Sequence, residues 1–464
     1  MRYLPNSPED RAQMLRTIGR ESVDALFGQI PQELRAQELL RLPGPLSESE
    51  ILDFFNQAAA ATSRGYVSLL GAGAYQHYRP VTIDMLLSRG EFFTAYTPYQ
   101  PEMSQGTLQA LFEFQTLIAQ LTGMEVANSS LYDGSTATNE AVLMAMRLTR
   151  RNRIVLARAV HPEYRQVVQT YGRNLGMEWV EASYSDSGQT DLSGLETAVN
   201  ASTAAVVVQF PNFFGCIEPI EEIVSLAHRS GALLIVVVTE PLSLAILKPP
   251  ANADIVCGEA QSFGVPVAFG GPYCGFLATK EKFVRQMPGR LVGETTDTQG
   301  RRGYVLTLVT REQFIRREKA TSNICTSQSL CALAATFYLC LLGKHGLRKL
   351  AEHNLAKACY AARELESALG LPAPFTAPHF NEFALKVPGR CSDLLESLLK
   401  EGIIGGLDLE RFYPELSNHL LVCVTEVVSK DALDRMAAAC QQFSSSVQSS
   451  AHSEDLRATS LHAV

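Results

Sequence analysis

Five polar side chains could bind a ligand or move a proton. Ser135 and Thr136 lie in a turn that begins with glycine, and His161, Glu240 and Gln261 each follow a short apolar segment. A Gly-Ser-Thr turn that opens a helix offers unpaired N–H groups and hydroxyls at the positive end of the helix dipole. The turn at 134–136 is therefore either a phosphate seat or an ordinary N-cap. Ligands of parallel sheets bind beyond the carboxyl ends of the strands. If the apolar segments are such strands, the five side chains form one site.

The apolar segments predict an α/β fold with a mainly parallel sheet. Short runs rich in valine and isoleucine alternate with amphipathic stretches, which is typical of strands buried on both faces by helices. The expected strands are 154–157, 204–210, 232–238, 254–257 and 275–279. The expected helices between them are 162–175, 191–200 and 218–230.

The stretch 254–280 is the centre of this pattern. It begins as a buried strand, passes through a turn and Gly270-Gly271-Pro272, and continues as a second strand. The loop between the strands holds three polar residues, Glu259, Gln261 and Ser262, and has no lysine before Lys280. Lys248, the other lysine near it in sequence, belongs to a different segment.

Two loops rich in tyrosine precede the sheet. Residues 71–80 and 94–102 have neither helical nor strand periodicity, and they hold aromatic and polar groups between glycines and prolines. Loops of this composition often line functional sites, although simple loop packing would give the same pattern. The candidate site residues here are His77, Tyr96, Tyr99 and Gln100.

A densely charged block at 311–319 is followed by Thr, Ser and Asn residues up to 326 and then by an apolar helix. Such a block is compatible with a solvated face, a subunit interface or an anion site. Arg316 and Asn323 are its candidate functional residues.

Composition limits the functional class. The net charge of −8 argues against non-specific binding to nucleic acid. The nine histidines are scattered without helical His pairs, so no metal site is expected. The ten cysteines stand singly, which predicts free thiols, and no secretory signal is evident. The apolar run 330–342 is too short for a membrane span. We expect a cytoplasmic protein that uses neither membrane nor nucleic acid.

Breaks and changes in composition predict four parts. They are an N-terminal helical arm (1–60), a large domain (61–343), a small α+β domain (344–443) and a disordered, serine-rich tail (444–464).

Three long motifs resemble one protein family. GAGAYQHYRP (71–80), FFTAYTPYQPEMSQGTLQALFEFQ (92–115) and REQFIRREKATSNICTSQSL (311–330) are similar to the glycine cleavage system P protein. More narrowly, they resemble subunit 1 of its split form, which is equivalent to the N-terminal half of the fused form. The resemblance runs to about residue 443. At Phe314 the family usually has histidine.

The resemblance implies an aspartate-aminotransferase-like, fold type I pyridoxal-phosphate (PLP) enzyme. Glycine dehydrogenase (decarboxylating), EC 1.4.4.2, removes CO2 from glycine and passes the aminomethyl group to the lipoyl group of H protein, in a system that also includes T and L proteins. PLP acts as an electron sink, while the protein binds and orients.

The family pattern is incomplete in this chain. By the resemblance, His161 stands where a histidine stacks on the PLP ring and 134–136 where the phosphate binds. The region of Glu240 replaces the aspartate at the ring nitrogen, and the region of Gln261 replaces the Schiff-base lysine. The resemblance therefore implies a degenerate pocket, with PLP held by a partner, subunit 2.

Six residues are candidates for completion of the partner's site: His77, Tyr96, Tyr99, Gln100, Arg316 and Asn323. Two alternatives remain open. One is a non-catalytic scaffold or regulatory paralogue of a PLP enzyme, and the other is a self-sufficient PLP enzyme that uses an unexpected lysine.

Overall fold

The computed structural model describes residues 5–36, 40–63, 65–268 and 270–461, with 63 and 450–461 as backbone only. The chain forms two compact units, residues 1–64 and 65–464. The first unit holds helices α1 (Pro8–Thr17) and α2 (Glu48–Ser63), and its end lies near the boundary expected at residue 60. None of the side chains described in this unit is buried.

The second unit is built on a seven-stranded sheet in the order β2-β8-β7-β6-β5-β3-β4. Strands β3 (Arg153–Ala157), β4 (Glu178–Ala182), β5 (Thr203–Gln209), β6 (Leu233–Val238) and β7 (Ile255–Glu259) are parallel. Strand β8 (Gly275–Thr279) is antiparallel to β7 and to the short β2 (Val126–Ala127). The predicted α/β fold with a mainly parallel sheet is confirmed.

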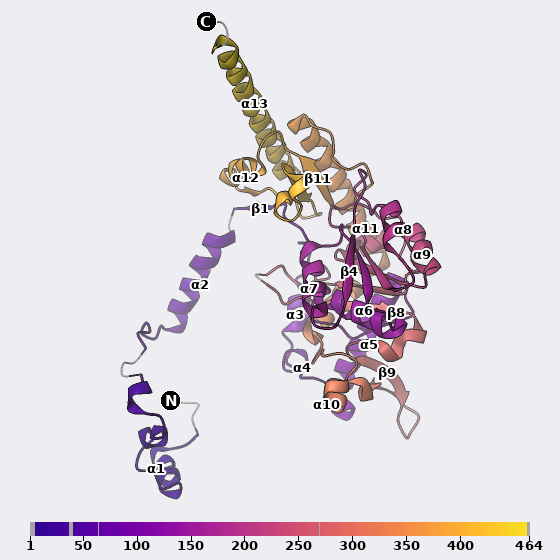
Figure 1. The fold of residues 1–464 in the computed structure, drawn as a ribbon. Helices are drawn as coiled ribbons and strands as arrows, with labels where there is room; N and C mark the ends of the chain where they lie inside the picture. The colour runs from indigo at the N-terminus through magenta and orange to yellow at the C-terminus, as the bar shows by residue number, and fades with distance from the viewer. Residues whose placement is uncertain (1–4, 37–39, 64, 269, 462–464) are drawn as a thin grey trace. The chain divides into compact units, whose positions relative to one another are not determined.

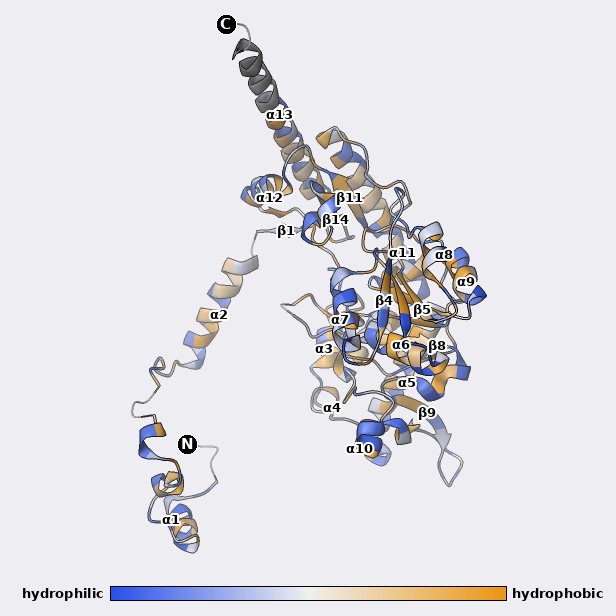
Figure 2. Ribbon diagram, viewed as in Figure 1, coloured by the Kyte–Doolittle hydropathy of each residue, from blue (hydrophilic) through white to orange (hydrophobic). Residues whose placement is uncertain are grey.

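Burial on both faces explains the apolar strands. Every residue of β5 and β7 is buried, and the strand labelled β5 is coloured hydrophobic in Figure 2. The helices that follow the strands are α6 (Gly134–Thr149), α7 (Pro162–Gly172), α8 (Leu192–Ala198) and α9 (Ile220–Arg229). Strand β4 was not predicted, because at the sheet edge most of its residues are exposed and its sequence is partly polar.

Further helices and a hairpin lie around the sheet and connect to the candidate loops (Figure 1). Helix α5 (Gln105–Thr122) packs on β8, on β9 (Leu291–Thr296) and on β10 (Arg302–Thr307), and the last two form an antiparallel hairpin. Short helices α3 (Thr82–Leu87), α4 (Gly90–Phe93) and α10 (Gln313–Arg316) lie within the loop segments.

Helix α11 (Ser329–Leu369) joins the two lobes of this unit. Its first part packs in the core of the sheet, and its second part packs in a separate apolar core. It is long and apolar enough to cross a membrane by length and composition alone, but half of its most apolar window is buried. Gly343 has φ 58° and ψ −176°, so the helix is kinked where the expected apolar run ends.

The small lobe contains β11 (Glu382–Lys386), β13 (Leu407–Asp408), β14 (His419–Cys423), helix α12 (Cys391–Lys400) and helix α13 (Lys430–Leu461). Strand β12 (Ile403–Ile404) pairs with β1 (Val67–Ser68), and Leu69 packs in the small-lobe core. Residues 67–69 therefore belong to the small lobe, whereas the large domain was expected to begin at 61. Hereafter, "large lobe" means residues 80–343.

The tail differs from the expectation of disorder. Residues 444–461 continue α13 as helix. Ser444 is buried and bonds to the Leu369 carbonyl (3.1 Å), and a side chain added at Gly389 would touch Val447. Because extension of an existing helix costs far less than nucleation, a polar sequence can remain helical after a packed segment.

Candidate functional site

The parallel strands bring the predicted pocket residues together. His161 follows β3 and caps α7, Glu240 follows β6, and Gln261 follows β7. Gln209, at the end of β5, links two of these strand ends. Its Oε1 accepts from the His161 N–H (2.8 Å), and its Nε2 donates to Thr239 Oγ1 (3.2 Å). The structure therefore brings side chains from these strand ends together at one edge of the sheet.

The hydroxyls of the Gly-Ser-Thr turn are engaged locally. Asp133 is the N-cap of α6, and its Oδ1 accepts from Ser135 Oγ (2.6 Å) and from Thr136 N (2.9 Å). Thr136 Oγ1 accepts in return from the Asp133 N–H at 3.3 Å. These contacts form a capping box. Asp133 and Thr136 form the box, and the Ser135 hydroxyl donates to the same carboxylate.

A carboxylate of the chain itself sits at the start of α6. Glu259, at the end of β7, is 1% exposed. Its oxygens accept from three backbone N–H groups, those of Gly134 (2.9 Å), Gln261 (3.0 Å) and Cys274 (2.7 Å). Burial raises the pKa of Glu259 to about 7, although these three donors oppose the rise. Two of the first backbone N–H groups of α6, those of Gly134 and Thr136, are thus already in use.

Gln261 holds an incoming tyrosine. Its Oε1 accepts from the Tyr75 N–H (3.0 Å), and its Nε2 donates to the Tyr75 carbonyl (3.1 Å). The Tyr75 side chain is fully buried, and its hydroxyl donates to Glu382 Oε2 (2.7 Å) and lies 3.4 Å from Thr239 Oγ1. Residues 71–79, which we call the crossing loop, therefore enter the pocket.

His77 and Glu240 form a buried ion pair. The Nε2 of His77 donates to Glu240 (2.8 Å), and its Nδ1 donates to Glu426 (2.9 Å), while its side chain is 2% exposed. Burial alone would lower the pKa of His77, but the two carboxylates together raise it to about 10. His77 was expected to reach a partner's site. The structure instead places it inside this chain's own pocket.

Two aromatic rings and the crossing loop contact the ring of His161. Tyr164 stacks on the ring with centroids 4.8 Å apart, and Phe213 meets it edge-on at 4.9 Å. The Nε2 of His161 lies 2.8 Å from the Ala72 carbonyl oxygen. Gly73 has φ +98°, and a side chain there would come within 2.9 Å of this ring. The crossing loop thus lies against His161, and burial lowers the pKa of the histidine.

The residues present do not fit PLP. Gln261 stands at the lysine position, and its amide oxygen and nitrogen both bond to Tyr75, whose side chain is buried. Glu259 accepts from the Gly134 N–H at the start of α6. The two lysines nearest in sequence bind elsewhere: Lys248 pairs with Glu221 (2.6 Å), and Lys280 donates to the Ala251 carbonyl.

The other candidates lie on exposed loops. The side chain of Tyr96 is 83% exposed and that of Tyr99 is 49% exposed. Gln100, Arg316 and Asn323 are exposed, and within the described ranges their side chains make no hydrogen bond or ion pair. We call these five residues the exposed loop surface: Tyr96, Tyr99, Gln100, Arg316 and Asn323.

A buried arginine, which the sequence reasoning missed, connects the two loops of this surface. Arg290 is 4% exposed. Its guanidinium donates to Tyr99 Oη (3.0 Å), Thr326 Oγ1 (2.8 Å) and the Cys325 carbonyl (2.9 Å). It also lies over the Tyr99 ring, 5.3 Å from the centroid. Because Arg290 precedes an unpredicted hairpin, no local pattern distinguished it.

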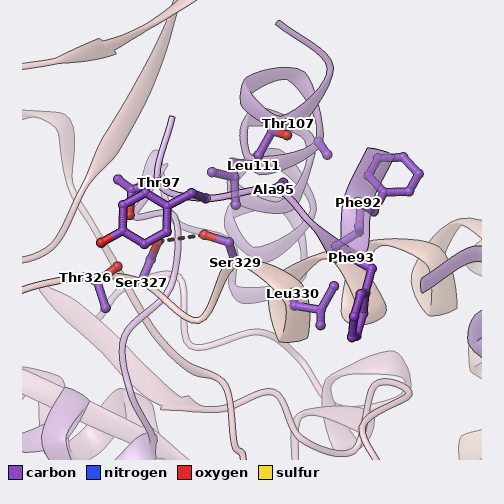
Figure 3. Close-up of a pocket in the computed structure, with 13 residues that line it drawn as sticks. Phe92, Phe93, Ala95, Thr97, Thr107, Leu111, Thr326, Ser327, Ser329 and Leu330 are labelled. Atoms are coloured by element: carbon purple, nitrogen blue, oxygen red, sulfur yellow. Dashed lines mark hydrogen bonds between the residues drawn. The ribbon is translucent and has the colours of Figure 1, made fainter. Parts of the chain in front are cut away.

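A pocket of about 240 Å³ opens between the same two loops (Figure 3). Hydroxyls of Thr97, Thr326, Ser327 and Ser329 face it beside apolar groups of Phe93, Leu330 and Leu333. The Ser327 and Ser329 hydroxyl oxygens are 3.1 Å apart. Tyr96 also lines this pocket, so the exposed loop surface borders a small cavity with both hydroxyl and apolar groups in its lining.

Comparison with known sequences gives one family. A family model described as "Glycine cleavage system P-protein" matches residues 1–439. "Probable glycine dehydrogenase (decarboxylating) subunit 1" of Koribacter versatilis (strain Ellin345) is 55% identical over 438 residues, covering 94% of this chain and 99% of that protein. The protein of the same name from Solibacter usitatus (strain Ellin6076) is 52% identical over 441 residues, covering 95% and 97% respectively.

Comparison with solved structures agrees. A crystal structure of glycine decarboxylase (P-protein) of the glycine cleavage system, in inhibitor-bound form, superposes with a TM-score of 0.86 at 42% identity. It covers 96% of this chain and 100% of that chain. A sphingosine-1-phosphate lyase from Burkholderia pseudomallei K96243, at 16% identity and a TM-score of 0.64, covers 93% and 99% and shows the shared fold alone. The fold is that of the fold type I PLP-dependent enzymes.

Proposed function

This chain belongs to the glycine cleavage system P-protein family, and we propose that it serves there as a subunit that holds no PLP and completes the active site of a PLP-bearing partner. Its relatives are named as subunit 1 of glycine dehydrogenase (decarboxylating), so the chain is part of a two-subunit enzyme that decarboxylates glycine. We propose that the partner is subunit 2 of this enzyme. We also propose that the complex works in the cytoplasm.

The reaction divides naturally between the two chains. Bound PLP supplies an electron sink for the decarboxylation of glycine. In our proposal the aminomethyl group then passes to the lipoyl group of H protein, and the T and L proteins act on later steps. The residues of this chain bind, orient and exclude water at that site, which is the protein's usual share of cofactor chemistry.

Each residue of the exposed loop surface has a suitable role. The guanidinium of Arg316 can pair with the carboxylate of glycine, because arginine binds carboxylates through two parallel hydrogen bonds. Gln100 and Asn323 can orient polar groups through their amides. Tyr96 and Tyr99 offer large aromatic faces that exclude water, and each carries a hydroxyl.

The contrast between pocket and surface carries the proposal. In the pocket around Gln261, which has no lysine, polar groups bond to the chain's own buried residues, and this supports a subunit that holds no PLP. On the exposed loop surface, the side chains of Gln100, Arg316 and Asn323 have no hydrogen-bond or ion-pair partner among the described residues, while Arg290 bonds to Tyr99 and to Thr326 beneath it. A subunit of this enzyme family can therefore contribute to chemistry through the surface.

The test is exchange of the glycine carboxyl group with bicarbonate by the reconstituted two-subunit enzyme with H protein. We expect Tyr96→Phe, Gln100→Ala and Asn323→Ala each to lower the exchange rate tenfold or more while the complex still assembles. Tyr171→Phe is the matched control, because Tyr171 is a half-exposed tyrosine on α7, away from these loops. Unchanged exchange in all three variants would favour the scaffold alternative.

A further inference from the structure

The crossing loop connects the two lobes of the second unit. It starts directly after β1 and Leu69, which pack in the small lobe. It ends at Arg79, whose Nε donates to the Gly264 carbonyl of the large lobe (2.5 Å), and Ile83, a few residues on, packs in the large-lobe core. Between these points the loop passes through the lysine-free pocket.

Small-lobe groups hold the loop on one side. Glu382 of β11 accepts from the Ala72 N–H (2.6 Å) and from the Tyr75 hydroxyl (2.7 Å). Thr425 Oγ1 donates to the Gln76 carbonyl at 2.6 Å. Together with the contact of His77 to Glu426, these bonds attach the middle of the loop to the small lobe.

Large-lobe groups hold the same residues on the other side. Tyr75 is bound at both its backbone N–H and its carbonyl by Gln261. The Nε2 of His77 donates to Glu240, and Glu240 also accepts from Asn381 Nδ2 of the small lobe (3.1 Å). Tyr75 and His77 therefore each contact both lobes through hydrogen bonds to buried partners.

The charges in the pocket resemble those of a bound cofactor. In a fold type I site an acidic residue faces the pyridinium nitrogen, and helix N–H groups face the phosphate. Here Glu240 faces the imidazolium of His77, and the Gly134 N–H at the start of α6 faces the carboxylate of Glu259. His77 therefore pairs with the acidic residue that would face the pyridinium nitrogen, and Glu259 bonds to the helix start that would face the phosphate.

We propose that the crossing loop and Glu259 permanently occupy the cavity in which related enzymes would hold the cofactor. The bonds of the crossing loop to both lobes then keep the two lobes in one arrangement. The cavity then accepts no phosphate compound, and the small lobe does not move relative to the large lobe during turnover. This inference goes beyond the proposed function, because it concerns the fixed shape of this chain rather than the residues offered to a partner.

The first test removes the internal anion. Glu259→Ala deletes a CH2–COO⁻ group, which has the size of acetate, and leaves three backbone N–H donors without a partner. We expect a lower Tm for this variant in the full-length chain, and we expect acetate to raise that Tm by about 2 °C or more through binding to the folded state. Chloride at equal ionic strength is the salt control.

Matched proteins complete this experiment. Glu222→Ala removes an exposed glutamate from the first turn of α9. Neither this control nor the natural chain should gain more from acetate or inorganic phosphate than from chloride. An equal acetate effect in Glu222→Ala, or a phosphate-specific rise in Tm of the natural chain, would overturn the proposal.

A second test needs no substitution and so remains decisive if Glu259→Ala does not fold. Hydrogen exchange of the natural chain within the two-subunit complex should show the Tyr75, Gln261 and Cys274 amides exchanging as slowly as amides of β5, both without and with glycine. Opening of the lobes would expose the Tyr75 amide, because the crossing loop contacts both lobes, whereas the Gln261 and Cys274 amides report on the bonds to Glu259 within the large lobe. Faster exchange at Tyr75 on addition of glycine would contradict a locked arrangement. Neither measurement depends on turnover, so failure here is distinguishable from failure of the proposed function.

Discussion

In the lysine-free pocket the acidic groups Glu240, Glu259 and Glu382 all have hydrogen-bond donors inside the chain. On the exposed loop surface, Arg316 and Asn323 have no side-chain partner in the described residues. Burial of unpaired polar groups costs free energy, whereas exposed ones remain solvated until a partner arrives. The comparison shows that the region at the family's cofactor position pairs its acidic groups inside the chain, whereas the exposed loops keep the Arg316 and Asn323 side chains unpaired among the described residues.

Among these predictions, the largest loss of stability and activity should come from substitution of Arg290, which links the two loops of the exposed loop surface. Arg290→Ala removes three hydrogen bonds at buried positions and should lower stability by about 2–4 kcal/mol, by the cost of breaking a buried, charged hydrogen-bond network. Bicarbonate exchange per assembled complex should fall strongly, because the Tyr99 and Thr326 loops lose their common anchor. Chemical denaturation and exchange assays measure the two effects.

Arg290→Lys sharpens this test, since a lysine keeps the charge but cannot bridge three acceptors in one plane. A loss in kcat with little change in KM for glycine would indicate mispositioned loops. Arg229→Ala, which breaks an exposed ion pair with Glu196 (3.0 Å), is the control and should have little effect. A normal exchange rate in the Arg290→Ala variant would show that the position of these loops does not affect the reaction.

Inside the pocket the effect should be on stability alone. Tyr75→Phe deletes the hydroxyl that donates to Glu382 and should cost about 1–3 kcal/mol, since it leaves a buried carboxylate short of a donor. Burial already raises the pKa of Glu382 to about 7. Exchange per assembled complex should match that of the natural enzyme. A selective loss of exchange without loss of stability would show that the pocket takes part in catalysis.

The pH dependence of stability tests the His77 ion pair. The pKa of His77 is raised from its ordinary value of 6.5 to about 10, so its stabilisation is full below pH 6.5 and is lost as pH rises through 10. The difference in Tm between the natural chain and His77→Gln should therefore be largest near pH 6 and should shrink toward pH 10. A difference that grows with pH would mean that His77 is neutral in the folded chain.

The smallest effect concerns Phe314, where the resemblance implies histidine. Its ring meets Tyr99 edge-on at 5.6 Å and is 47% exposed. Phe314→His should change stability by less than about 1 kcal/mol, as is usual for a half-exposed contact. Exchange should stay within about twofold. A larger loss would show that this ring, and not only Arg290, positions Tyr99.

The strands and the lysine-free pocket could be predicted because their signals are local. The run 275–279 is apolar and short, and it is strand β8 with those bounds. The missing lysine before Gly270 is visible in the sequence itself. Strand β4 was missed, because its exposed Glu178 and Trp179 do not resemble a buried strand.

The fate of the crossing loop could not be predicted, because its partners are distant in sequence. Tyr75 bonds to Glu382, which is 307 residues away, and His77 bonds to Glu426 at a separation of 349. A tyrosine and a histidine among glycines are equally compatible with an exposed loop and a buried one. Arg290 was missed for the same reason, since two of its partners stand 35 and 36 residues later.

Borohydride reduction of the reconstituted two-subunit enzyme with PLP tests the central claim most directly, because it fixes the cofactor to the lysine that holds it. Peptide mass spectrometry should find the label on a lysine of the partner and none on this chain. A stoichiometric label on a lysine of this chain, such as Lys248 or Lys280, would contradict the account.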